Sequence, residues 1–301
     1  MTEAAGLQPE GFLIIDKPSG ATSHTVLRKV AARLGPKVKA GHAGTLDSFA
    51  TGILVCLFGR YTRLADYFMV AGKSYLATLQ FGSETDTLDP TGTVCRTAAL
   101  PTLAALEAVL PNFRGSIRQF PPVYSAVHVD GKRAYQRVLD GETPAMEERS
   151  IQIQGLRLLS FDGQQAVMEI DCSKGTYIRS LARDIGQAAG SCAYLAALRR
   201  TASGPFSLAD SITPEHVSQN GLRPLSAALA VALDLSVIKL DSDQAAAFRH
   251  GRPLLFLPTF QALAAGGKAG VAVFDMDDVF LGIVSGQAGA WSYAFVLAAQ
   301  L

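Results

Sequence analysis

The sequence lacks the marks of a secreted or membrane-anchored protein. Its first residues, MTEAAGLQPEG, are acidic rather than basic and contain no apolar core, which argues against a secretory signal peptide. No uninterrupted apolar stretch approaches the roughly 20 residues that a membrane-spanning helix needs. We therefore expect a cytoplasmic protein that makes no contact with a membrane.

Cysteine is scarce, and its positions favour neither a disulfide framework nor a zinc site. Cys56, Cys95, Cys172 and Cys192 stand far apart and form no CxxC motif. Such spacing is typical of reduced, buried thiols.

Motifs of several enzyme classes are also missing. The sequence contains no HxxxH pair of metal ligands and no GxSxG nucleophile elbow. The acidic segment ETDTLDPTG lacks the spacing and the closing glutamate of a calcium loop, so it predicts a turn. We expect no metal site and no cofactor.

Net charge is close to zero. The chain has 27 Lys and Arg against 26 Asp and Glu, so a polyanion could be bound only through a local basic patch. The hydrophobic content of 49% over 301 residues is typical of an ordinary globular protein with one or two domains.

Hydrophobic spacing predicts a mixture of strands and helices. Short apolar runs predict strands at 12–15, 53–58 and 73–82. Helical spacing follows Ser23, which we take as an N-cap, and it returns at 176–190.

Asp162-Gly163 predicts the turn of a hairpin between two longer apolar segments. Hairpins and separate helices together favour an α+β fold over regular βαβ alternation. The pattern changes near Leu233, so we expect one domain over 1–235 and a compact β-rich domain over 236–301.

Polar residues that could carry chemistry gather in three places. These are GHAGTLDSFATGIL at 41–54, the surroundings of Tyr75, and SKGTYIRS at 173–180. Each has an ordinary structural explanation. Asp47 could cap a helix, and Tyr75 could be a plain strand aromatic.

The remaining polar residues also have ordinary structural explanations. His42 could be a hydrogen-bonded core histidine, while Arg179 and Arg183 lie off the apolar face of their predicted helix, where exposed arginines are common. Motifs alone leave the function open.

Six segments in the same order resemble the TruB family of tRNA pseudouridine synthases, over roughly residues 10–210. They are LIIDKPSGATSH, GHAGTLDSFATGIL, KSYLATLQFGSETDTLDPTG, PPVYSAVHVDGKRAYQRVLDGE, CSKGTYIRSLARDIG and LRRTASGPF. Collinear agreement is far more specific than any single motif. The resemblance implies a pseudouridine synthase catalytic fold, with a mixed, mainly antiparallel sheet and flanking helices. It also implies isomerisation of uridine 55 in the tRNA T-loop, without metal or cofactor.

The resemblance assigns the chemistry to three residues. Asp47 stands at the position of the catalytic aspartate, and Arg179 at that of the arginine paired with it. Tyr75 matches the tyrosine that stacks on the target uracil. A guanidinium suits this pairing because its planar fork orients a carboxylate and favours the ionised form.

The resemblance also implies residues that hold the substrate. His42 matches the histidine that fills the space left by the everted base, and Tyr177 and Leu198 match positions lining the base pocket. Lys17 matches a family lysine that we expect to serve structure or RNA contact. Base flipping costs a few kcal/mol, which stacking and a plug in the vacated space offset.

The sequence departs from the family pattern at three positions beside these residues. Ala43, Ser48 and Phe49 stand where the family commonly has Thr, Pro and Leu, which affects loop geometry more than chemistry. The C-terminal segment is only weakly similar to the small RNA-binding domain called PUA.

A local basic patch is expected in the second half of the catalytic region. Its members are Lys174, Arg179, Arg183, Arg199 and Arg200, which could contact RNA phosphates. The ordinary alternative is that half of them form solvated ion pairs.

Two other functions remain open. One is an RNA-binding module without catalysis, although binding alone needs no buried acid. The other is an N-glycosidase or base-exchange enzyme with Asp47 as nucleophile, which would release free uracil. Relatives that depend on a guide RNA typically carry basic tails for assembly, and this chain has none. We therefore expect a stand-alone enzyme acting on the tRNA T-arm, with no guide RNA and no obligate protein partner.

Overall fold

The computed structural model describes residues 9–254, 258–261, 270–287 and 290–297. Its main feature is a nine-stranded sheet in the order β1-β3-β12-β4-β11-β10-β7, with β2 beside β3 and β13 beside β12. The strands are β1 (Gly11–Lys17), β2 (Ala40–His42), β3 (Thr51–Phe58), β4 (Lys73–Phe81), β7 (Gly115–Gln119), β10 (Arg149–Phe161), β11 (Gln165–Cys172), β12 (Ala193–Ser203) and β13 (Phe206–Ser207).

This sheet is antiparallel except at one junction, where β12 pairs with β3 in parallel. The junction consists of Arg199 opposite Thr51 and Arg200 opposite Gly52. Gly52 has a φ of +100°, and a Cβ there would lie 2.2 Å from the backbone oxygen of Arg200. Only glycine lets the two strands approach this closely.

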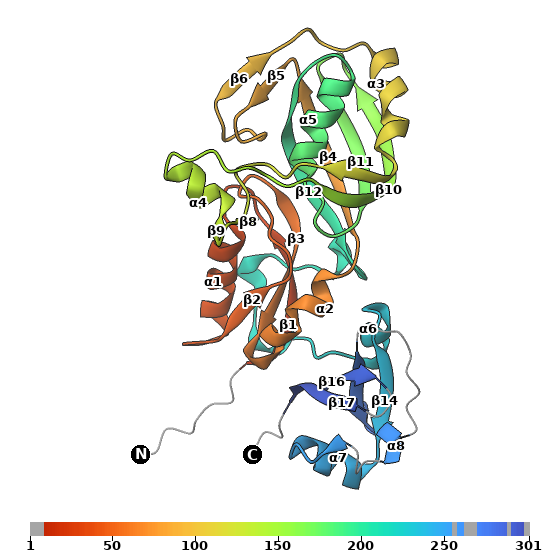
Figure 1. Ribbon diagram of the computed structural model, residues 1–301. Coiled ribbons are helices and arrows are strands. Elements are labelled where there is room, and N and C mark those ends of the chain that lie inside the picture. The colour runs from red at the N-terminus through yellow and green to blue at the C-terminus, as the bar shows by residue number, and fades with distance from the viewer. Residues whose placement is uncertain (1–8, 255–257, 262–269, 288–289, 298–301) are drawn as a thin grey trace.

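Helices and short hairpins surround the sheet (Figure 1). The helices of this part are α1 (Ser23–Leu34), α2 (Ala65–Met69), α3 (Leu103–Val109), α4 (Ala134–Leu139), α5 (Ile178–Ala188) and α6 (Ala227–Ala232), with 3₁₀ turns at Gly59–Leu64, Leu110–Phe113, Leu208–Asp210, Pro214–His216 and Gln219–Gly221. Two small hairpins are separate from the sheet: β5 (Ser83–Thr85) with β6 (Val94–Thr97), and β8 (His128–Val129) with β9 (Lys132–Arg133). No helix among the described residues is long and apolar enough to span a membrane.

The expected apolar face of α5 is present and packs on the sheet. Ile178, Leu181, Ala182 and Ile185 are buried in one cluster with residues of β4, β11 and β12. The predicted cap of α1 is wrong by one residue. Thr22 accepts from the amide of Thr25 and is the N-cap, whereas the Ser23 hydroxyl bonds to both the amide and the carbonyl of Leu46.

A second, four-stranded sheet follows in the order β14-β15-β16-β17. Its elements are β14 (Ser236–Leu240), α7 (Ser242–Arg249), α8 (Pro258–Gln261), β15 (Val271–Asp275), β16 (Phe280–Gln287) and β17 (Ala290–Val296). Apolar residues of this sheet share one core cluster with β1 and β3, and the rings of Tyr61 and Phe280 lie 6.0 Å apart. The expected α+β fold with a β-rich C-terminal part is confirmed.

Candidate functional site

A cavity of about 670 Å³ opens where the loop after β2 meets the N-terminus of α5. Its wall includes His42 from β2, Asp47 from the loop, Tyr75 from β4, Tyr177 and Arg179 from the start of α5, and Leu198 from β12. Six of the residues expected in the site thus come together from positions far apart in the sequence.

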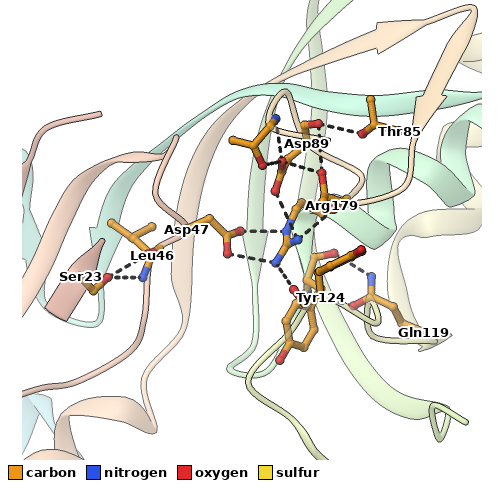
Figure 2. Close-up of polar contacts among 11 residues, drawn as sticks. Ser23, Leu46, Asp47, Thr85, Asp89, Gln119, Tyr124 and Arg179 are labelled. Atoms are coloured by element: carbon orange, nitrogen blue, oxygen red, sulfur yellow. Dashed lines mark hydrogen bonds and ion pairs between the residues drawn. The ribbon is translucent and has the colours of Figure 1, made fainter. Parts of the chain in front are cut away.

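Asp47 and Arg179 form a two-pronged ion pair in this cavity (Figure 2). Nε of Arg179 lies 2.9 Å from Oδ2 of Asp47, and an Nη2 hydrogen bond of 3.0 Å reaches Oδ1. The Asp47 side chain is 34% exposed, whereas that of Arg179 is 6% exposed. A substrate can therefore reach the carboxylate while the guanidinium stays behind it.

The arginine is fixed by three further contacts. Its guanidinium donates to the carbonyl of Thr87 at 2.9 Å and to that of Tyr124 at 3.0 Å, and it contacts Oδ2 of Asp89 at 3.4 Å. Figure 2 shows Arg179 between the two carboxylates. A planar donor with this many partners has little freedom to rotate.

Asp89 is a site residue that sequence reasoning missed. It is 5% exposed and accepts hydrogen bonds from the side chains of Thr87 and Thr91. The predicted turn at 84–92 is present, and Leu88 adopts a positive φ of 61° just before the aspartate. The sequence signal for Asp89 is that several hydroxyl side chains flank the Asp-Pro pair. This composition is typical of a turn held by side-chain hydrogen bonds.

Opposing effects act on the charge of Asp47. Burial raises the pKa of its carboxyl above the ordinary value, and the nearby Asp89 acts in the same direction. The charge and hydrogen bond of Arg179 lower the pKa, so this arginine favours the ionised form. Asp47 does not begin a helix, which removes the N-cap explanation.

Two aromatic rings and an aliphatic side chain line the cavity beside the carboxylate. Tyr75 is 7% exposed and lies opposite Arg200 in the β4–β12 register. Leu198 projects from β12, and Tyr177 is the N-cap residue of α5. Together they form an apolar surface beside a single acid.

His42 is not a hydrogen-bonded core histidine. Among the described residues, its buried Nδ1 has no hydrogen-bond partner. Burial and the positive charge of Arg200 lower the pKa of its imidazole, which favours the neutral ring.

Lys17 lies outside the cavity wall. Its side chain is fully buried, and Nζ donates to the carbonyls of Pro18, Ala21 and Ser48. Burial lowers its pKa to about 8. Of the two roles expected for Lys17, the geometry supports structure rather than contact with substrate.

The three atypical positions of the loop are held mainly through the backbone. The carbonyl of Ser48 accepts from Lys17 and from the amide of Gly20, and the carbonyl of Phe49 accepts from Ser19. Ala43 is fully buried. The loop position therefore does not depend on a threonine, proline or leucine at these sites.

The expected single basic surface is not found. Arg199 and Arg200 are adjacent on β12, so their side chains point to opposite faces. Arg199 pairs with Asp16 at 2.7 Å. Arg200 also lines the cavity, but it is 1% exposed and donates to the carbonyls of Ile53 and Gly44.

Of the other predicted phosphate contacts, Lys174 and Arg183 differ in their surroundings. Arg183 pairs with its neighbour Asp184 and does not line the cavity. Lys174 is exposed, next to Gly175 on the cavity wall. No group of three or more His, Cys, Asp or Glu in the described part of the chain could hold a metal ion.

Comparison with known proteins gives this site a family context. Residues 30–178 match the family model of the TruB family pseudouridylate synthase N-terminal domain, and residues 179–229 match that of the tRNA pseudouridylate synthase B C-terminal domain. A Bordetella pertussis protein named tRNA pseudouridine synthase B is 48% identical over 219 residues, covering 71% of this chain and 89% of the relative. A protein of the same name from Borreliella burgdorferi is 44% identical over 215 residues, covering 70% and 76% respectively.

A solved structure shares the fold beyond the stretch that these family models match. The "Crystal Structure of a Cbf5-Nop10-Gar1 Complex" contains a chain that aligns with a TM-score of 0.67 and 25% identity, covering 95% of this chain and 83% of its own. The family models match 200 consecutive residues, 30–229, that carry the Asp47–Arg179 pair and all of the cavity wall except Thr22, Ser23 and His24. The chain therefore belongs to the TruB family of pseudouridylate synthases.

Proposed function

We propose that this protein isomerises uridine 55 in the T-loop of tRNA to pseudouridine, with Asp47 as the catalytic carboxylate. The observation that carries the proposal is the pairing of a partly exposed Asp47 with a buried Arg179 in a cavity lined by Tyr75. The name of these relatives, tRNA pseudouridine synthase B, supplies the substrate class.

The cavity suits a nucleotide that has left its stack. Enzymes that act on a base must expose it, and aromatic faces offset the cost of unstacking. Tyr75 and Tyr177 offer such faces, and Leu198 offers apolar contact. His42, whose neutral form is favoured, lines the same cavity, and we assign it to the space from which the base departs.

A single acid suffices for this reaction. The N1–C1′ bond of the uridine breaks, the uracil turns over, and C5 bonds to C1′. C5 loses its proton to solvent and N1 takes one up, so the product is an isomer and the leaving group is also the incoming nucleophile. A glycosidase that activates water commonly uses a pair of carboxyl groups. Here the second acid, Asp89, is buried behind Arg179 and serves to hold it.

Recognition of the tRNA is proposed to extend beyond the cavity. Lys174 is exposed beside the cavity wall and could contact a phosphate. We assign residues 1–235 to catalysis and 236–301 to RNA binding, and we expect neither guide RNA nor an obligate protein partner. A tRNA substrate implies action in the cytoplasm.

The test uses an unmodified T-arm hairpin carrying tritium at C5 of the target uridine. Isomerisation releases the label to water without releasing free uracil, whereas a glycosidase would release the base. Asp47→Ala should abolish label release while hairpin affinity changes by less than about threefold, because a group that acts in the transition state contributes less to ground-state binding.

The matched control is Asp66→Ala, which removes an exposed carboxylate on α2 outside the cavity. It should leave label release unchanged. Residual turnover by Asp47→Ala at the wild-type rate would refute the role of Asp47, and free uracil would favour the glycosidase.

A further inference from the structure

The first turn of α5 carries two site residues but has no cap of its own. Tyr177 is the N-cap residue and Arg179 the second helical residue, and no side-chain cap bond is made at Tyr177. Tyrosine cannot accept from the first helical amides as Ser, Thr, Asp or Asn would. The position of this turn must therefore be set from outside the helix.

Gln119, the last residue of β7, makes that outside contact. Its side chain is buried, with the residue 1% exposed. Nε2 donates to the carbonyl of Tyr177 at 3.1 Å, and Oε1 accepts from the amide of Tyr177 at 2.9 Å. Both ends of one amide thus bind both backbone groups of one residue, which fixes its position and its orientation.

The chain that follows Gln119 continues this contact along the same turn. The carbonyl of Phe120 accepts from Ser180 at 2.7 Å, and the carbonyl of Tyr124 accepts from Arg179 at 3.0 Å. These two contacts use backbone carbonyls of the 119–124 segment, whereas Gln119 contributes a side chain. A substitution at Gln119 therefore tests the alignment directly.

Arg149 contacts the same tyrosine in a different way. It is the register partner of Gln119 in the β10–β7 pair, and its guanidinium carbon lies 5.7 Å from the centroid of the Tyr177 ring. This cation–π contact bears on the ring alone. Gln119 instead binds the backbone of Tyr177, and so it also affects the position of Arg179, two residues later in the same turn.

We propose that Gln119 is a positioning residue that sets the first turn of α5, so that Tyr177 lines the cavity and Arg179 meets Asp47. The inference rests on the proposed function only for its kinetic readout. Gln119 touches neither the cavity nor the reacting atoms, since it is absent from the cavity wall.

The experiment compares Gln119→Met, which keeps length and volume but loses both hydrogen bonds, with Gln119→Glu, which keeps only the acceptor for the Tyr177 amide. We expect kcat to fall by about tenfold or more in Gln119→Met and by less in Gln119→Glu, since small misplacements are costly. KM for the hairpin should change little.

The pH profile separates positioning from a loss of folded protein. Asp47 must be ionised, so activity is lost as the pH falls through its pKa. A displaced Arg179 lowers that pKa less, so the acid limb of Gln119→Met should move to higher pH. A loss of folded enzyme would lower the rate at every pH and leave the limb in place.

Gln80→Met is the matched control. Gln80 is a buried glutamine of the same sheet, and its side chain bonds to the Phe81 carbonyl and to Gln165. This variant should keep the wild-type acid limb. An unshifted limb in Gln119→Met, or an equal shift in Gln80→Met, would overturn the proposal.

A titration without RNA makes the test independent of the reaction. The Asp47 carboxyl carbon, observed by NMR in labelled protein, should titrate at higher pH in Gln119→Met than in the wild type. An unchanged Asp47 pKa would sink the inference about Gln119. If the wild type does not isomerise the hairpin, the proposed function is wrong. The titration would still test the role of Gln119 in that case.

Discussion

At the scale of single residues, the charge on Asp47 depends on a guanidinium held from several directions. The guanidinium of Arg179 donates to Asp47 and to the carbonyls of Thr87 and Tyr124, and it also contacts the carboxylate of Asp89. Such a network favours one orientation of the carboxylate as well as its ionised form. Geometry and charge state are therefore altered by the same substitution.

Arg179→Lys is expected to lower kcat by about a hundredfold, because a single ammonium cannot reproduce a two-pronged pair. With the opposing charge farther away, the pKa of Asp47 rises further above its ordinary value, so the acid limb of the rate moves to higher pH. Single-turnover label release between mildly acidic and neutral pH measures both effects.

The control is Arg157→Lys, which alters an exposed ion pair with Glu169 on the sheet. Exposed pairs contribute little, so its rate and pH profile should match the wild type. A wild-type rate in Arg179→Lys would show that the pairing with Asp47 is not needed.

The residues that sequence reasoning missed share a physical cause. Asp89 and Gln119 act through partners 90 and 58 positions away, and no local periodicity encodes such distances. Arg200 was expected in a basic patch that contacts RNA phosphates. Its burial depends on the carbonyls of Ile53 and Gly44, which only the folded sheet brings close.

At the scale of elements, local patterns predicted what local forces determine. The hairpin at Asp162-Gly163 and the apolar face of α5 follow from turn chemistry and helical spacing, and both are present. Strand order does not follow from such patterns. In particular, the parallel junction of β3 with β12 joins segments about 150 residues apart, and the sequence hints at it only through Gly52 at the start of an apolar run.

Gly52→Ala should disrupt this junction. The new Cβ would meet the Arg200 oxygen at 2.2 Å, at a φ of +100°, so the strands must separate or the backbone must change. We expect a loss of about 3 kcal/mol or more in the free energy of unfolding and lower activity, because Arg200 lies on the cavity wall.

Urea unfolding and label release test this expectation. The control is Gly163→Ala, also at positive φ but with no atom within 4 Å of the new Cβ. It should lose only about 1 kcal/mol, the cost of the backbone conformation. Equal losses at the two glycines would mean that the close approach of β3 and β12 contributes nothing.

At the scale of the whole molecule, the second sheet is packed against the first part of the chain through an apolar core. Tyr61 contacts Phe280, and the guanidinium of Arg63 lies over the Phe295 ring and donates to the Ala294 carbonyl. Figure 1 shows this part of the chain at the end of the molecule away from α5 and the β5–β6 hairpin. The RNA binding proposed for this part of the chain would therefore take place away from α5, which carries Arg179.

Removal of residues 236–301 should accordingly weaken hairpin binding more than the chemical step. We expect Kd to rise by about tenfold or more, through lost phosphate contacts, while kcat at saturating hairpin stays within about threefold. The thermal midpoint should fall as well, because the apolar surface around Tyr61 becomes exposed to solvent.

Arg63→Ala separates the loss of RNA contacts from the loss of stability. It weakens the attachment of the second sheet while keeping residues 236–301, so it should retain most of the affinity for the hairpin. If the truncated protein bound the hairpin as tightly as the full chain, RNA recognition would lie entirely within residues 1–235, and the second sheet would have to serve another purpose.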